Sequence, residues 1–341
     1  MKQRVLIVSA DFFGYQNSVA RAFEKIGFDT KTVTYDEPIH PFRGLLKWRH
    51  KFSHNREALR AESRAKYAVY IRSIFDSYSP RYVFIYNGTI LEDDTLDYFR
   101  NHGSKVIVWM YDSVQRADRS MCISHIDHAD LFCCFEARDV DFYAKQNKVA
   151  YFMPLSVDSS VYYPIGNQKK DIDILFVGTI YVSPKRIDLL ERLAERYKDK
   201  NLLFYGYYKP YFKDPIGWLK MNNRSVFKNR NIAPEQVNTL FARSKIALNI
   251  HNQQTFSGAN QRLFEACGAC VYQICDRNPY IQSIFPNGEV GLYDDFDGMC
   301  RLIDYALSHD MTPQAEAAHE VVMKYHTFDA RISEMLRLMG E

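Results

Sequence analysis

The feature that most constrains the fold is an alternation of short apolar runs with segments of helical periodicity. Because the runs are continuously apolar, we expect strands buried on both faces of a parallel sheet, with the helices as crossovers. Right-handed crossovers then build a doubly wound unit. The strands expected before residue 154 are Val5–Ser9, Tyr82–Tyr86, Lys105–Tyr111, Leu131–Phe135 and Val149–Met153. The helices expected between them are Asn17–Gly27, Asn55–Tyr78, Glu92–His102 and Ala137–Gln146.

A segment rich in turn residues, 154–170, interrupts this alternation, which then restarts. Further strands are expected at Ile172–Val177, Leu202–Tyr205, Lys245–Ile250 and Cys270–Cys275, and further helices at Lys185–Tyr197, Pro234–Arg243, Gln261–Ala269, Phe296–Ser308 and a tail, Pro313–Met339. The sequence therefore predicts an α/β protein with two doubly wound, Rossmann-like domains, residues 1–155 and 170–325, facing across a cleft. A carboxyl-terminal helix, 326–341, is expected to cross back to the first domain.

Composition excludes several classes of protein. The chain has 341 residues, 47% of them hydrophobic and 25% charged, as in a globular protein rather than a disordered one. Its net charge of +3 gives no reason to expect nucleic acid as a partner. No apolar run approaches the roughly 18 residues that cross a bilayer. The seven cysteines, an odd number, indicate reduced thiols and a cytoplasmic location.

Ligands of doubly wound sheets bind beyond the carboxyl ends of the strands, so residues just after expected strands are candidates. His251 follows one such strand, where it would donate to a phosphate or a sugar; a histidine satisfied in a loop is the alternative. Asp112 follows another, where it would act as general base, or would only cap the next turn. Gly14 follows the first strand, where its amide would approach a ligand, or would form a plain tight turn.

The most informative segment is Leu248–Gly268, in which a strand ends in a polar loop and a helix begins near Asn260. A helix amino terminus is a ready anion site. Arg262 in the first turn would grip a diphosphate, and Glu265 one turn on would accept two ribose hydroxyls. We expect Glu265 at the edge of a cleft. The alternative is an intrahelical Arg–Glu pair on a solvated face.

Asn260-x-Arg262-x-Phe-Glu-Ala with a following Cys-Gly resembles the signature of GT-B glycosyltransferases. The branch it is most similar to is the CgeB-like, spore-maturation-type group with a family-1-like carboxyl-terminal domain. Further resembling segments are 174–179 with Arg186, 244–249, 288–294 and 325–331, and in the amino-terminal half 106–113 and 152–158. The resemblance covers nearly the whole chain and is most specific from 172 to 294.

This resemblance implies transfer of a sugar from a nucleotide sugar without a bound metal or other cofactor. Glu265 would hold the ribose, Arg186 and Arg262 the diphosphate, with Asn260 and Gly14 completing the donor site and His251 and Asp112 as catalytic residues. Related retaining enzymes carry a second glutamate eight positions earlier, where this chain has Ser257. The donor sugar and the stereochemistry of transfer stay open.

Segment 41–81 carries ten basic and three acidic residues with interleaved aromatic side chains. It would contact an anionic membrane face or a lipid-linked acceptor, or form a basic solvated helix. Cys267-x-x-Cys270 has no second pair with zinc spacing, and the His125/His128 and His50/His54 pairs have no third ligand, so no metal site is expected. Aromatic residues in 205–230 would stack on a sugar or a base, or pack in a loop.

The function predicted is a bacterial glycosyltransferase of polysaccharide biosynthesis. It would be cytoplasmic or peripheral at the inner membrane face, with a cell-surface glycan, glycoconjugate or lipid-linked molecule as acceptor. Two rivals are a nucleotide-sugar epimerase on the same fold and a non-catalytic sugar-binding or assembly protein.

Overall fold

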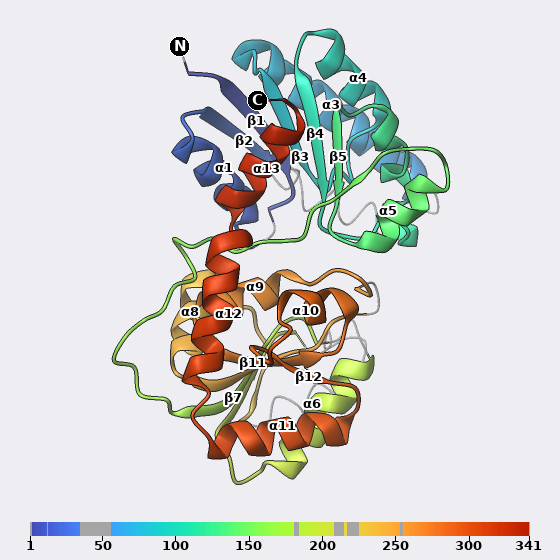
Figure 1. Cartoon of the computed structure of the whole chain (residues 1–341). Coiled ribbons are helices and arrows are strands. Elements are labelled where there is room, and N and C mark those ends of the chain that lie inside the picture. The colour runs from blue at the N-terminus through green and yellow to red at the C-terminus, as the bar shows by residue number, and fades with distance from the viewer. Residues whose placement is uncertain are drawn as a thin grey trace. The chain divides into compact units, whose positions relative to one another are not determined.

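The computed structural model describes residues 2–11, 13–34, 56–180, 184–207, 215–216, 225–252 and 255–340. The chain divides into two compact units (Figure 1). Unit 1 contains Met1–Met153 and Arg331–Glu341, and unit 2 contains Pro154–Ala330. Unit 1 is therefore discontinuous in sequence, because its last segment follows the whole of unit 2.

The sheet of unit 1 has the strand order β2-β1-β3-β4-β5-β6, and each neighbouring pair is parallel. The chain runs from β1 to β2 on one side and then crosses to β3 on the other side of β1, so the switch point of the sheet lies between β1 and β3. The strands are β1 (Arg4–Ser9), β2 (Asp29–Thr34), β3 (Tyr82–Tyr86), β4 (Lys105–Met110), β5 (Leu131–Cys134) and β6 (Tyr151–Phe152).

Helices pack against both faces of this sheet (Figure 1). Apolar strands need such cover, since burying one large aliphatic or aromatic side chain stabilises the fold by roughly 1.5–3 kcal/mol. The helices are α1 (Tyr15–Lys25), α3 (Arg56–Tyr78), α4 (Asp93–Asn101), the 3₁₀ turns η1 (Ala117–Cys122) and η2 (Ser124–Asp127), α5 (Ala137–Ala144) and α13 (Phe328–Leu338), which begins in unit 2.

The sheet of unit 2 is also parallel, with the order β12-β11-β10-β7-β8-β9. Its switch point lies between β7 and β10, because the chain moves outward from β7 through β8 and β9 and then returns to β10. The strands are β7 (Ile172–Val177), β8 (Leu202–Tyr205), β9 (Phe227–Lys228), β10 (Ser244–Asn249), β11 (Tyr272–Asp276) and β12 (Gly291–Tyr293).

Helices again cover both faces (Figure 1), and on one of these faces the strand side chains pack with helical side chains in an apolar core. The helices are α6 (Pro184–Arg196), α8 (Pro234–Ala242), α9 (Gln261–Gly268), α10 (Pro279–Ile284), α11 (Phe296–Ser308) and α12 (Thr312–Tyr325). The predicted fold class, two doubly wound parallel α/β units, is confirmed.

Two expectations about elements are wrong. The tail is two helices and not one, because Thr327 pairs with Val157 in a parallel bridge between α12 and α13. Val157 N donates to His326 O and Phe328 N donates to Val157 O, so Val157 engages the backbone on both sides of Thr327, where the helix is interrupted. Strand β2 was not predicted, because it lies at the edge of the sheet and its mostly polar residues alternate between exposed and partly buried.

A close approach of two glycines sets the carboxyl edge of the unit 2 sheet. Gly206, just after β8, has φ 142°, and a Cβ there would lie 1.8 Å from Gly178 O, just after β7. Gly178 N donates to Tyr205 O, and Ile180 N donates to Tyr207 O. These contacts hold the loop after β7 against the loop after β8.

We therefore expect Gly206→Ala to lower the free energy of unfolding by roughly 2–4 kcal/mol, because the methyl group meets backbone that must shift. Chemical denaturation measures this. Gly166→Ala is the control, since a Cβ there meets no atom within 4 Å, and its effect should stay within about 0.5 kcal/mol. Equal effects of the two substitutions would contradict the packing argument.

Candidate functional site

The carboxyl edge of the unit 2 sheet, at the switch point between β7 and β10, holds a group of buried polar and charged side chains. We call Lys185, Arg186, His251, Asp276 and Tyr293 the switch-point cluster. They come from the start of α6, the end of β10, the end of β11 and the end of β12. The five residues thus meet at the carboxyl edge of the sheet, where doubly wound sheets bind ligands.

Arg186 ties the two strands of the switch point together. Its side chain is buried, and Nε donates to Ile250 O at 2.7 Å while Nη1 donates to Thr179 O at 2.8 Å. Burial lowers the pKa of Arg186 to about 10, so the guanidinium is still charged at neutral pH. Arg186, which the sequence predicts to bind phosphate, therefore also has a structural role, because it joins the loop after β7 to the end of β10.

His251 is buried against Asp276. The backbone N and the ring Nδ1 of His251 contact Asp276 Oδ1 at 2.8 and 2.9 Å. Burial by itself would raise the pKa of Asp276, but the hydrogen bonds and charge of His251, with Lys185, hold that pKa well below its usual range. Nε2 of His251 is buried and has no hydrogen-bond partner among the described residues.

Tyr293 and Lys185 complete the cluster. The hydroxyl of Tyr293 is a second buried polar atom with no hydrogen-bond partner in the described part of the chain. Burial, then the nearby charge of Asp276, raises the pKa of Tyr293, so the phenol stays protonated. Lys185 Nζ lies 3.2 Å from Asp276 Oδ2, with half of its side chain exposed. Lys185 and Arg186 outnumber the single carboxylate of Asp276, so the net charge of the cluster is positive. His251 Nε2 and the Tyr293 hydroxyl are buried atoms with hydrogen-bonding capacity that the described residues do not use.

Helix α9 begins at the same edge of the sheet, because it follows β10. Asn260 is its N-cap, and Oδ1 accepts from Leu263 N at 3.1 Å. Asn249 and Asn260 exchange side-chain amide hydrogen bonds of 2.9 and 2.7 Å, which fixes the helix start to the strand end. A capped helix amino terminus carries a partial positive charge. The predicted helix start at Asn260 is thus present.

Arg262 and Glu265 form an ion pair, but in a buried setting. Arg262 Nη1 lies 2.6 Å from Glu265 Oε2, and the Glu265 side chain is only 1% exposed. Tyr162 hydrogen-bonds both partners, and burial followed by the charge of Glu265 raises its pKa. The expected place of Glu265 at the edge of a cleft is wrong, because Tyr162, 103 residues earlier, covers it. Its ribose-binding role remains a prediction.

Asp112 and Gly14 lie in unit 1. Arg116 Nη1, Arg119 Nη2 and Asn87 Nδ2 contact the Asp112 carboxylate at 3.0, 2.6 and 3.3 Å. Both carboxylate oxygens are thus held by donors from three residues, whereas a general base needs an oxygen within reach of the acceptor proton. Gly14 has φ 75° and begins α1, which is a conformation that favours glycine. Neither residue belongs to the unit that carries the other predicted donor residues.

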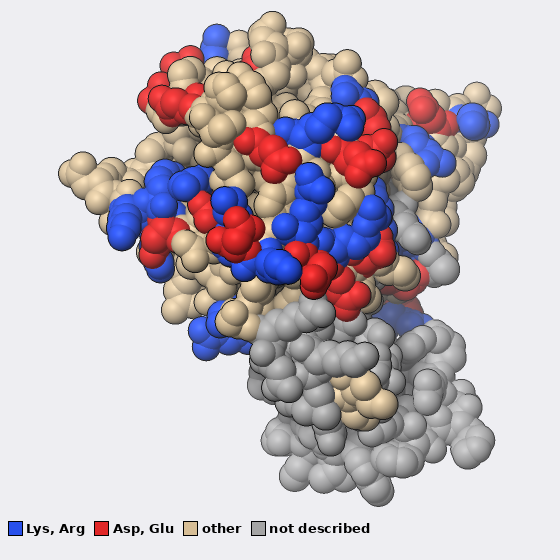
Figure 2. Space-filling view, turned by 90° about the horizontal axis from the view of Figure 1, so that it is seen from below, with Lys and Arg blue, Asp and Glu red and all other residues tan. Residues whose placement is uncertain are grey.

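The remaining candidates add no ligand site. The described cysteines are free, Cys267 among them buried, and the described residues hold no group of three or more metal-ligating side chains. Residues 41–55, with His50 and His54, and most of 205–230 lie outside the described residues. Of the described helices, none is long and apolar enough to span a bilayer. On the face in Figure 2, basic and acidic side chains are interspersed over the described residues, unlike a continuous basic surface for nucleic acid.

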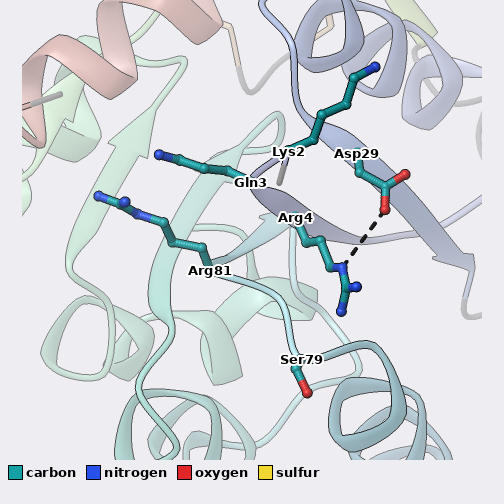
Figure 3. Close-up of a pocket in the computed structure, with 6 residues that line it drawn as sticks. All are labelled: Lys2, Gln3, Arg4, Asp29, Ser79 and Arg81. Atoms are coloured by element: carbon teal, nitrogen blue, oxygen red, sulfur yellow. Dashed lines mark ion pairs between the residues drawn. The ribbon is translucent and has the colours of Figure 1, made fainter.

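A pocket of about 490 Å³ lies at the other, amino-terminal edge of the unit 1 sheet (Figure 3). Arg4 there caps helix α3 by donating to Tyr78 O at 2.8 Å, and its Nε lies 4.0 Å from Asp29 Oδ2. The side chains of Lys2 and Arg81 extend in different directions. The cations do not converge, so we assign this pocket no ligand. Its lining residues are Lys2, Gln3, Arg4, Asp29, Ser79 and Arg81.

Comparison with known proteins gives the fold. Residues 185–337 match the glycosyl transferase-like family model. The whole chain superposes on sucrose-phosphate synthase from Thermosynechococcus elongatus with a TM-score of 0.70 at 12% identity, covering 99% of this chain and 98% of that one. The chain has the GT-B fold.

Two further GT-B structures agree. One is the Burkholderia xenovorans α,α-trehalose-phosphate synthase in complex with glucose-6-phosphate (TM-score 0.66, 13% identity, coverage 99% and 100%). The other is the trehalose-6-phosphate protein from E. coli bound with UDP-2-fluoro glucose (TM-score 0.65, 11% identity, coverage 98% and 99%). No curated protein matches the chain. The prediction of a glycosyltransferase is confirmed at the level of fold and enzyme class.

The buried pair in α9 leads to a stability prediction. Glu265→Ala should lower the free energy of unfolding by about 3–5 kcal/mol, because it removes the carboxylate from a buried ion pair. Asp188→Ala, which removes the exposed partner of Arg192 on α6, should cost no more than about 1 kcal/mol. Urea denaturation compares the two. A small effect at Glu265 would mean that the pair opens readily.

Proposed function

We propose that this GT-B protein binds a nucleotide-sugar donor at the carboxyl edge of the unit 2 sheet and transfers the sugar to a hydroxyl group of an acceptor. Nucleoside diphosphate and a proton are the other products. The observation that carries the proposal is the switch-point cluster, where two cations and two unused buried polar atoms meet beside the start of α9. Such a site suits a diphosphate.

The described cluster suggests how each group would act. Lys185 is exposed enough to reach a phosphate, whereas Arg186 would contribute its charge and its hold on the two strands. His251 Nε2 and the Tyr293 hydroxyl would bond the phosphate oxygens. Charge that develops on the departing phosphate would thus meet fixed positive groups, which is the usual source of a large rate enhancement.

The solved neighbours support a donor and an acceptor in general terms. One is bound with UDP-2-fluoro glucose and another is in complex with glucose-6-phosphate. For this chain we infer a nucleotide sugar as donor and a cell-surface glycan, glycoconjugate or lipid-linked molecule as acceptor, as the resemblance to the CgeB-like group implies. A bacterial, cytoplasmic setting, peripheral at the membrane through 41–81, belongs to the same proposal.

Asp112 and Glu265 each have partners within the structure that bear on their predicted roles. Asp112 stays a candidate general base, but its two arginine partners favour a role in holding η1. Glu265 would bind the ribose only after Arg262 or Tyr162 gives up a contact with it. An epimerase or a non-catalytic binding protein would use the same donor site, so binding alone does not separate the three.

Calorimetric titration with UDP, ADP, GDP and dTDP tests the donor site. Lys185→Ala should weaken the best of these roughly 10- to 100-fold, the value of one charged hydrogen bond, and leave the nucleoside unaffected. Lys198→Ala, a cation beyond the far end of α6, should change nothing. Unchanged diphosphate affinity in Lys185→Ala would overturn the assignment. Epimerised donor without acceptor, or binding without turnover, would favour a rival.

Metal removal is a separate test. Because Lys185, Arg186 and the α9 amino terminus would neutralise the diphosphate, EDTA should leave turnover intact. Release of nucleoside diphosphate from the nucleotide sugar is measured before and after chelation. Activity lost in EDTA and restored by magnesium or manganese would contradict metal independence.

A further inference from the structure

Asp276 contacts both His251 and Lys185 in the switch-point cluster, although it stands at the end of a strand that carries none of the predicted site residues. Its Oδ1 accepts from the backbone N and contacts the ring Nδ1 of His251, and its Oδ2 lies 3.2 Å from Lys185 Nζ. Both carboxylate oxygens are therefore used. The side chain is only 18% exposed, so water competes little for these contacts.

These contacts fix the state of the His251 ring. An ionised carboxylate can only accept hydrogen bonds, so Nδ1 must carry its hydrogen. The low pKa of Asp276 supports the ionised form. Nε2, on the far side of the ring, is then the atom left for a ligand, and it is buried with no partner among the described residues.

We propose that Asp276 is a positioning residue of the donor site, which holds His251 with Nε2 available to the donor diphosphate and favours a protonated ring once that diphosphate is bound. This inference rests on the proposed function. It adds a residue that acts through His251 and does not touch the substrate. No covalent step is assigned to either side chain.

Charges on the packed elements decide when the ring gains its proton. Asp276 from β11 favours the imidazolium, while Lys185 and Arg186 from α6 oppose it, and Tyr293 from β12 is neutral. A diphosphate brings negative charge that offsets the two cations. Binding should therefore favour the imidazolium, and proton uptake should accompany binding.

Calorimetry in buffers of different ionisation enthalpy counts the protons taken up. Wild-type protein titrated with UDP, ADP, GDP and dTDP should take up a net fraction of a proton near pH 7 with the nucleotide that binds. His251→Gln should abolish the part of this uptake that belongs to the ring. Asp276→Asn should reduce it and weaken the nucleotide roughly 5- to 50-fold, because the ring loses its anion and its fixed orientation.

Asp294→Asn is the matched control, since Asp294 is an exposed partner of Arg277 close to the same strand ends. It should leave affinity and proton uptake as in the wild type. If Asp276→Asn lowers only thermal stability, with affinity and proton uptake of the folded fraction unchanged, Asp276 is merely structural and the inference is wrong.

A measurement on the wild type keeps the test decisive should Asp276→Asn fail to fold. Long-range ¹H–¹⁵N NMR of the ring, assigned with His251→Gln, should give the Nδ1–H tautomer in the free protein. The Nε2–H tautomer would overturn the inference even if nucleotides bind. Failure of all four nucleotides to bind the wild type would instead refute the proposed donor site, and the inference with it.

Discussion

The buried guanidinium of Arg186 is the interaction on which the candidate site depends. Its hydrogen bonds to Ile250 O and Thr179 O link the end of β10 to the loop after β7, the two strands of the switch point. Without it, both carbonyls would lose a hydrogen bond from a charged donor, worth roughly 1.5–3 kcal/mol each. The Gly178–Gly206 contact restrains the same edge from the β8 side. A rigid edge of this kind holds His251 and Tyr293 in place before any ligand arrives.

Much of the fold could be predicted because buried parallel strands can be recognised in the sequence as continuous apolar runs. β3, β7 and β8 have the bounds expected for them. The strands that were missed lack that signal: β2 is mostly polar at a sheet edge, and β9 and β12 are only two and three residues long. The break between α12 and α13 depends on Val157, and no local pattern around Thr327 reveals that contact.

The site was predictable only in part, for a related reason. Arg186, His251 and Asn260 follow strands or begin helices, so local position alone marks them. Asp276 and Tyr293 matter because β11 lies beside β10 and β12 beside β11, and that strand order is a property of the sheet and not of any segment. The burial of Glu265 likewise depends on Tyr162, which comes from the connection before β7.

The division of unit 1 into two stretches of sequence bears on how the chain folds during synthesis. The strands of its sheet leave the ribosome first, but Arg331–Glu341 follow only after all of unit 2. Until then the face that α13 covers lacks its last helix, and Met335 and Leu336, buried in the finished structure, are still missing from it. Unit 2 can complete its core earlier. The first unit to be translated is therefore the last to be finished.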